Sequence, residues 1–227
     1  DRYGDVLVAQ ITTAGMERLK IEIVAALEKV IKPRAILWRN DSPSRELEGL
    51  NRYVEPAMGE VPELILLEEN GAKFEVPLTT GQKTGWFYDQ RMNRERLRHY
   101  VRGAKVLDVF SYLGAFGVQA ACAGAESVIC VDSSQKSPEW ISRNAELNGV
   151  TEKLTVQRDD AFEVLRRLRA ERQRFDVVIL DPPAFIKRKK DAKEGTLAYQ
   201  RLNQMAMQVL AKDGMLLSCS CSYHLHR

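Results

Sequence analysis

Five short apolar runs alternate with helical stretches over residues 105–219, and this alternation constrains the fold more than any other feature of the sequence. Strands that are joined by helical crossovers lie parallel in one sheet, with helices on both faces. The sequence therefore predicts an α/β fold with a Rossmann-like, doubly wound, mostly parallel sheet. The expected strands are Lys105–Val109, Ser127–Val131, Leu154–Gln157, Asp176–Leu180 and Met215–Cys219. The expected helices lie near residues 114–122, 138–148, 160–173 and 196–212.

Residues 1–77 have a different pattern, which predicts a small α+β domain with the order β-α-β-β-β. Strands are expected at Val6–Ala9 and Ala35–Trp38, with an amphipathic helix over residues 16–30 between them. Prolines and glycines in residues 41–60 favour a long loop. Asn70-Gly71 separates two apolar runs and favours a β-hairpin, because a type I′ turn needs positive φ at both residues. We therefore expect two domains, 1–77 and 78–227.

Composition excludes several classes of protein. Hydrophobic residues make up 44% and charged residues 29% of the chain, which is typical of a globular protein with a buried core. No apolar run approaches the roughly 20 residues of a transmembrane helix, so no membrane partner is expected. The four cysteines form no C-x-x-C and no Cys/His cluster, so we expect neither a disulfide framework nor a metal site. Reduced cysteines in turn predict a cytoplasmic protein.

Positive charge is concentrated in the second part of the chain. Residues 1–77 carry a net charge of −4 and residues 78–227 a net charge of +7, within a total of +3. Two basic runs stand out, Arg91–Lys105 and Lys187–Lys193. A single run is more often a solvated surface, and a phosphate-binding surface is favoured only where a run lies on the side of the active site. The second run follows the end of the fourth strand, so we expect it to contact phosphates.

Polar residues follow the first three strands of the predicted sheet, where ligands of open parallel sheets bind. Residues 108–117 follow the first strand and lack the G-x-G-x-x-G pattern, so a nicotinamide-dependent dehydrogenase is the least expected function. Asp132 ends the second strand, where a carboxylate can accept hydrogen bonds from ribose hydroxyls. Asp159 and Asp160 end the third strand, where one could accept from an adenine amino group or merely cap the next helix.

The fourth strand ends in Asp181-Pro182-Pro183-Ala184-Phe185, which is the most specific local signal. Two consecutive prolines remove two backbone donors and stiffen the chain. Their carbonyl groups are left to accept hydrogen bonds from a ligand at the strand ends. The sequence thus predicts that this segment lines the binding crevice.

Together, these strand ends resemble a class I S-adenosylmethionine-dependent methyltransferase. Four further segments are similar to bacterial large-subunit ribosomal RNA cytosine-5 methyltransferases: residues 80–91 (TGQKTGWFYDQR), 110–116 (FSYLGAF), 144–149 (NAELNG) and 220–222 (SCS). The resemblance runs over the whole chain. Members of that family also carry an N-terminal PUA domain and a final helix and β-hairpin. We therefore expect a fragment that lacks the PUA domain and is C-terminally incomplete.

The resemblance implies S-adenosylmethionine as the cofactor and large-subunit ribosomal RNA as the partner. The implied cofactor-binding residues are Gln90, Arg91, Phe110, Ser111, Tyr112, Gly114, Asp132, Asp160, Ala161 and Asp181. The implied reaction is methylation of carbon 5 of a cytosine through a cysteine adduct, with Cys221 and Asp181 as the catalytic residues. Cys219 lies two residues before Cys221 and would face the same side of an ideal strand, and the resemblance favours Cys221.

Two other functions remain open at this point. Asp-Pro-Pro followed by an aromatic side chain can also hold an exocyclic amine, so methylation of a nucleobase amino group is one alternative. An RNA-binding module without catalysis is the other, and saturable cofactor binding would distinguish it from an enzyme. The sequence leaves the oligomeric state open, a homodimer included.

Overall fold

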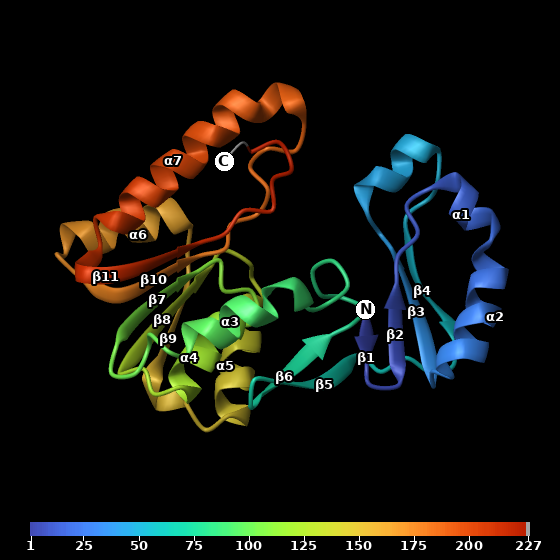
Figure 1. Cartoon of the computed structure of the whole chain (residues 1–227), viewed down its shortest axis with the longest axis horizontal. Helices are drawn as coiled ribbons and strands as arrows, with labels where there is room; N and C mark the ends of the chain where they lie inside the picture. Colours follow the sequence, from blue (N-terminus) through green and yellow to red (C-terminus); the bar gives the residue numbers. More distant parts are fainter. Residues whose placement is uncertain (226–227) are drawn as a thin grey trace. The chain divides into compact units, whose positions relative to one another are not determined.

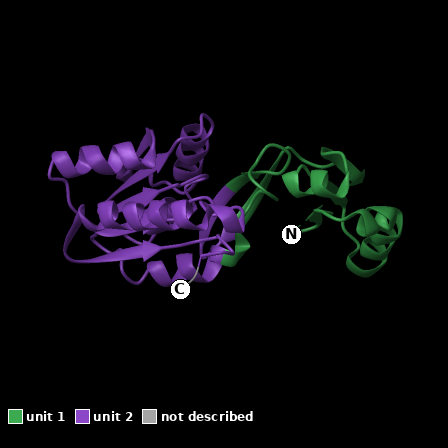
Figure 2. Ribbon diagram, turned by 90° about the horizontal axis from the view of Figure 1, so that it is seen from above, with its two compact units in different colours: residues 1–67, 75–89 green, residues 68–74, 90–227 purple. Residues whose placement is uncertain are grey.

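The structure is a computed structural model, it describes residues 1–225, and the chain divides into two compact units (Figure 2). Unit 1 comprises Asp1–Leu67 and Glu75–Asp89, and unit 2 comprises Glu68–Phe74 and the chain from Gln90 onward. The division therefore differs from the single boundary expected after residue 77. Glu68–Phe74, at the tip of a hairpin, belongs to unit 2, whereas Glu75–Asp89 belongs to unit 1.

Unit 1 contains a four-stranded sheet of order β1-β2-β3-β4. β2 and β3 are parallel, whereas the two outer pairs are antiparallel. The strands are β1 (Arg2–Tyr3), β2 (Val6–Ala9), β3 (Ala35–Asn40) and β4 (Tyr53–Met58), and the helices are α1 (Ala14–Arg18) and α2 (Lys20–Ile31).

The prediction of a long loop over residues 41–60 is wrong. This stretch contains the 3₁₀ helix η1 (Pro43–Glu48) and strand β4. Pro56 lies inside β4, opposite Leu37 of β3. A proline is tolerated there because β4 is an edge strand, where one side of the backbone needs no ladder partner.

The predicted hairpin is confirmed. It pairs β5 (Leu64–Glu69) with β6 (Ala72–Pro77). Asn70 and Gly71 form its turn with φ angles of 54° and 77°, as a type I′ turn requires.

Unit 2 contains a five-stranded parallel sheet of order β11-β10-β7-β8-β9, which confirms the predicted fold class. The strands are β7 (Lys105–Val109), β8 (Ser127–Asp132), β9 (Leu154–Arg158), β10 (Phe175–Leu180) and β11 (Leu210–Ser218). The chain runs outward from β7 to β9 and then returns to place β10 on the other side of β7. The strand order therefore reverses between β7 and β10.

Helices cover both faces of this sheet (Figure 1). α4 and α5 pack on one face, and α6 and α7 lie on the other. The helices of unit 2 are α3 (Arg91–Leu97), α4 (Ala115–Cys122), α5 (Ser137–Leu147), α6 (Ala161–Ala170) and α7 (Ala192–Met207), with the 3₁₀ helices η3 (Thr151–Lys153) and η4 (Lys189–Asp191), while η2 (Tyr88–Gln90) leads into α3.

Successive strand residues alternate between two separate cores. Val106 and Ile179 pack with α4 and α5, whereas Leu107 and Leu180 pack with α6 and α7. A parallel sheet that is buried on both faces reads as continuous apolar runs, which explains the sequence pattern. Within residues 1–225, no helix is long and apolar enough to cross a membrane.

Candidate cofactor and active site

The strand order reverses between β7 and β10, and the carboxyl ends of strands at such a reversal are where ligands bind in open α/β sheets. The two strand ends are tied together by the Asp181 N–H, which donates to the Val109 carbonyl over 3.4 Å. The residues that follow β7 and those that follow β10 therefore meet at this point. Most of the site residues predicted from sequence lie on these two segments and on the neighbouring ends of β8 and β9.

The turn after β7 has a strained backbone. Phe110 and Tyr112 have φ angles of 68° and 52°, and Gly114 has 78°. Positive φ at two aromatic residues costs free energy and is typical of functional sites. Ser111 stabilises the turn from inside, because its hydroxyl donates to the Asp108 carbonyl over 2.6 Å and accepts the Val131 N–H over 3.0 Å.

Asp108 lies beneath this turn and is 1% exposed. Its Oδ2 accepts the N–H of Gly117 over 3.0 Å. Burial raises the pKa of the Asp108 carboxyl from 3.8 to about 7, and the negative charges of Asp181 and Asp132 add to the rise. The charges of these two carboxylates thus act on Asp108 from the ends of the two strands next to β7.

Asp132 is held by the backbone in a fixed orientation. Its Oδ2 accepts the Tyr112 N–H over 2.9 Å, and its Oδ1 accepts the Ser134 N–H over 2.8 Å. An ionised carboxylate has about four acceptor positions, so two remain for ligand hydroxyls. This half-buried carboxylate fits the ribose diol of S-adenosylmethionine.

The two acids after β9 have different partners. Asp159 pairs with Arg167 over 2.7 Å, and this hydrogen bond lowers the pKa of the Asp159 carboxyl. Asp160 caps α6, because its Oδ1 accepts the N–H groups of Phe162 and Glu163. Ala161 begins α6, so its N–H has no partner inside the helix. The second oxygen of Asp160 and the Ala161 N–H are a suitable acceptor and donor for an adenine edge.

The two cysteines after β11 do not share a strand face, so that expectation is wrong. β11 ends at Ser218, and both cysteines lie in the irregular chain that follows it. Cys221 is exposed, and its Sγ lies 3.9 Å from the carbonyl oxygen of Pro182. The Sγ of Cys219 lies instead 3.8 Å from Oε1 of Gln90. Cys221 is thus the cysteine beside the Asp-Pro-Pro segment.

Gln90 and Arg91 lead into α3. The contact with Cys219 brings Gln90 to the carboxyl end of the sheet. Arg91 is exposed, and its carbonyl accepts a hydrogen bond from Asn70 at the tip of the hairpin. The structure therefore ties Gln90 to the candidate site more closely than Arg91.

A buried ion pair that the sequence did not indicate fixes α3 on unit 2. Arg94 and Glu69 are both about 2% exposed in their side chains and bond through two nitrogen–oxygen pairs of 2.5 and 3.1 Å. Gln119 of α4 donates to the same carboxylate over 3.0 Å. Arg94 lies within the basic run Arg91–Lys105, which by its charge alone is expected at the surface. One signal in the sequence indicates that Arg94 is buried: it lies three residues before the apolar Leu97, so both share one face of the helix.

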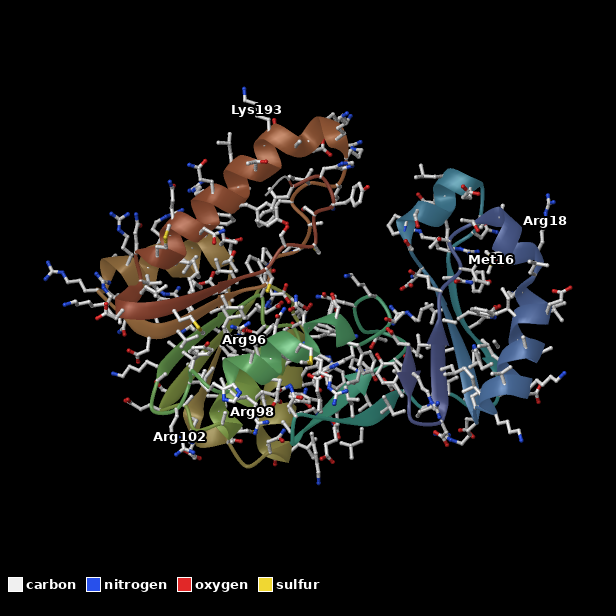
Figure 3. All side chains as sticks on the ribbon, viewed as in Figure 1. Met16, Arg18, Arg96, Arg98, Arg102 and Lys193 are labelled. Carbon is white, nitrogen blue, oxygen red and sulfur yellow. The ribbon has the colours of Figure 1, made fainter. Side chains whose placement is uncertain are left out.

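The two basic runs differ in their position on unit 2. Lys187–Lys193 follows the Asp-Pro-Pro segment and leads into α7, at the carboxyl edge of the sheet. The other run begins with Arg91, next to Gln90, and extends to Arg102, which precedes β7 and so lies at the amino edge. Figure 3 shows Lys193 on α7 and Arg98 and Arg102 at the opposite end of the unit. The run Lys187–Lys193 thus lies as a whole where a phosphate-binding surface near the site is expected.

Comparison with known proteins identifies the family. A family model described as S-adenosylmethionine-dependent methyltransferase matches residues 42–224. The chain belongs to the S-adenosylmethionine-dependent methyltransferase family. The ribosomal RNA large subunit methyltransferase I of Erwinia tasmaniensis is 40% identical over 224 residues, which cover 98% of this chain and 57% of that protein. The chain thus spans little more than half the length of the curated relatives it matches.

Two solved structures share the fold at similar coverage. A proposed S-adenosylmethionine-dependent methyltransferase from Streptococcus mutans has a TM-score of 0.80 and 28% identity over 94% of this chain and 54% of its own. A proposed methyltransferase complexed with SAH has the same TM-score and identity, over 94% of this chain and 55% of its own. The cofactor of the family is S-adenosylmethionine, and SAH is what it becomes after methyl transfer. The residues at the ends of β7, β8 and β9 fit that cofactor. Within residues 1–225, no cluster of metal-binding side chains is present.

Proposed function

We propose that this chain methylates carbon 5 of a cytosine in large-subunit ribosomal RNA, with Cys221 as the nucleophile. The observation that carries the proposal is the position of Cys221, whose exposed thiol lies 3.9 Å from the Pro182 carbonyl in the segment that follows β10. The substrate class is supported by relatives named ribosomal RNA large subunit methyltransferase I. Unit 2 is accordingly proposed as the cofactor-binding domain, and a cytosolic location remains part of the proposal.

The chemistry requires a thiolate because carbon 5 of cytosine is a weak nucleophile. The Cys221 thiolate forms a bond to carbon 6, and the electron pair of the 5,6 double bond then becomes available at carbon 5. Asp181 hydrogen-bonds the cytosine amino group or ring nitrogen and helps to protonate the ring as the thiolate adds. S-adenosylmethionine, when bound, would supply an electrophilic methyl group, whose bond to the sulfonium sulfur breaks as the bond to carbon 5 forms. A base then takes the proton of carbon 5, the double bond re-forms, the thiolate of Cys221 leaves, and the ring returns its added proton to Asp181.

The cofactor is proposed to lie across the ends of β7, β8 and β9. Asp132 accepts the ribose hydroxyls with the positions that its two backbone hydrogen bonds leave open. Asp160 and the Ala161 N–H bind the adenine edge. The turn Phe110–Gly114 and Gln90 line the remainder of the cofactor site, and Arg91 contributes a positive charge toward the cofactor carboxylate.

RNA phosphates are proposed to contact the basic run Lys187–Lys193. Replacing its four lysines by glutamine should flatten the salt dependence of RNA binding, by a log–log slope of about 0.7 for each lost contact with single-stranded RNA. The same change in two residues near the amino edge, the half-buried Arg98 and the exposed Arg102, is the control and should leave the slope nearly unchanged. Equal slopes in the lysine variant and the unmodified protein would contradict the assignment.

The nucleophile is tested with RNA that carries 5-fluorocytosine at the target position. Fluorine on carbon 5 cannot leave as a proton does, so the adduct between enzyme and RNA persists. The unmodified protein and Cys219→Ala should trap this RNA covalently, whereas Cys221→Ala should bind the cofactor normally and trap none. Trapping that disappears in Cys219→Ala but survives in Cys221→Ala would transfer the role to Cys219. Full methylation by both variants would refute covalent catalysis and favour amino-group methylation at Asp181.

A further inference from the structure

Two buried hydroxyl groups connect the segment after β10 with the turn that carries Cys221. Tyr199 of α7 is 5% exposed and Ser222 is 9% exposed. Their side-chain oxygens lie 2.8 Å apart, so they share a hydrogen bond. Neither residue is at the surface, and Tyr199 belongs to none of the motifs that the sequence analysis singled out. The pair joins α7 to the residue that directly follows the proposed nucleophile.

The same hydroxyls satisfy the backbone of the segment that follows the two prolines. The Ile186 N–H donates to Ser222 Oγ over 3.1 Å. The Phe185 N–H donates to the Tyr199 hydroxyl, and that hydroxyl donates to the Pro183 carbonyl, each over 3.5 Å. Residues 183–186 belong to no helix or strand, so these side-chain contacts replace a regular hydrogen-bond ladder.

Helix α7 also supports this segment by close packing. The ring centroids of Tyr199 and Phe185 lie 4.7 Å apart. At Gly195, one helical turn earlier, a Cβ atom would lie 2.4 Å from Ile186 Cγ1 and 2.8 Å from the Phe185 carbonyl oxygen. Only glycine lets the helix approach the segment so closely. Gly195 and Tyr199 of α7 therefore pack against Phe185 and Ile186, which follow the Asp-Pro-Pro segment.

We propose that Tyr199 and Ser222 are positioning residues that hold the Asp-Pro-Pro segment and the Cys221 turn in one fixed arrangement. The inference rests on the proposed function of Cys221. The two segments come from different strands, and the 3.9 Å contact between Cys221 Sγ and the Pro182 carbonyl depends on their relative position. Covalent addition needs the thiolate and the base to approach within a narrow geometry, and a displacement of about 1 Å can lower the rate on the order of 100-fold.

Tyr199→Phe and Ser222→Ala test the inference, because each removes one hydroxyl and retains most of the packing. We expect either change to lower kcat at least tenfold and to leave KM for S-adenosylmethionine unchanged. The double variant should be no worse than the more affected single variant, since both hydroxyls act through one arrangement. Ser222→Thr keeps the hydroxyl and should recover most of kcat. Tyr100→Phe, at an exposed tyrosine, is the matched control and should have full activity.

A second measurement needs no RNA substrate and so separates this inference from the proposed function. Iodoacetamide alkylation, followed by peptide mapping, gives the rate at Cys221 relative to the exposed Cys122. Loss of either hydroxyl should make the turn that carries Cys221 more mobile, so the ratio of alkylation rates should rise at least threefold in Tyr199→Phe and in Ser222→Ala. An unchanged ratio together with full kcat would overturn the inference. If the unmodified protein does not methylate cytosine, the proposed function fails, and the alkylation ratio alone decides whether the two hydroxyls hold the turn.

Discussion

Asp108→Asn should change how the stability of the protein depends on pH, because the Asp108 carboxyl is buried and its pKa is raised to about 7. In the unfolded chain this carboxyl returns to its ordinary pKa of 3.8. Between these two values the folded protein retains a proton that the unfolded chain releases. The unfolded state thus binds fewer protons, so the contribution of Asp108 to the free energy of unfolding falls as pH rises through this window.

The magnitude follows from the difference of about 3 pKa units. Each unit corresponds to about 1.4 kcal/mol, so the loss between pH 4 and pH 7 is on the order of 4 kcal/mol. An asparagine has nearly the same shape, and its side-chain oxygen can still accept the Gly117 N–H. Since it does not ionise, the variant should lack this part of the pH dependence and gain stability relative to the unmodified protein as pH rises.

Urea unfolding at several pH values between 4 and 8 measures the effect. The difference in the free energy of unfolding between the unmodified protein and Asp108→Asn should change by about 1.4 kcal/mol for each pH unit up to about pH 7, and then level off. Asp213→Asn, at an exposed carboxyl, is the control and should follow the unmodified protein. Parallel curves for the unmodified protein and Asp108→Asn would refute the reasoning.

Three further changes test the site and its support. Asp132→Ala should weaken S-adenosylmethionine binding about 5- to 150-fold by loss of ribose hydrogen bonds, and calorimetry that finds equal affinity in Asp132→Ala and in the control Asp159→Ala would contradict the assignment. Glu69→Ala removes the carboxylate that pairs with the buried Arg94 guanidinium and should lower the free energy of unfolding by about 3–5 kcal/mol, with no loss in urea unfolding as the contrary result. Gly117→Ala places a Cβ atom where Cys130 Sγ would lie only 2.4 Å away and should cost about 1–3 kcal/mol, part of which Cys130→Ala should restore. A simple sum of the two losses in the double variant would rule out that contact.

The centre of the parallel sheet could be predicted from sequence because β7 and β10 are buried along most of their length and so appear as continuous apolar runs. β4 has no such signal. It is an edge strand with partly exposed side chains, and its proline and the neighbouring glycines resemble those of a loop. Local composition is therefore a better guide for the strands of the parallel sheet, including the partly buried β9 and β11, than for β4. The same limit explains why the last strand was expected to extend as far as Cys219, although its pairing with β10 ends at Ser218.

The candidate site was predictable where a residue directly follows a strand, and less so where contacts join distant parts of the chain. Asp132 is the last residue of β8 and Asp181 directly follows β10, so the strand-end rule located both. The different surroundings of Cys219 and Cys221 depend on how the chain turns after β11. Tyr199 is 23 residues from Ser222, and Glu69 is 25 residues from Arg94, so neither pair leaves a pattern in the local sequence.

The strand order explains why a methyl donor and a nucleobase would meet at one place. β7, β8 and β9 carry the residues that fit the cofactor, and β10 and β11 carry the Asp-Pro-Pro segment and Cys221. Since β7 and β10 are neighbours across the reversal, their two groups of residues adjoin at that pair of strand ends. The Asp181 N–H donates to the Val109 carbonyl there, and the negative charge of Asp181 raises the pKa of the Asp108 carboxyl. Asp181 therefore lies where the two groups meet, and under the proposed function its replacement should weaken cofactor binding and base binding together.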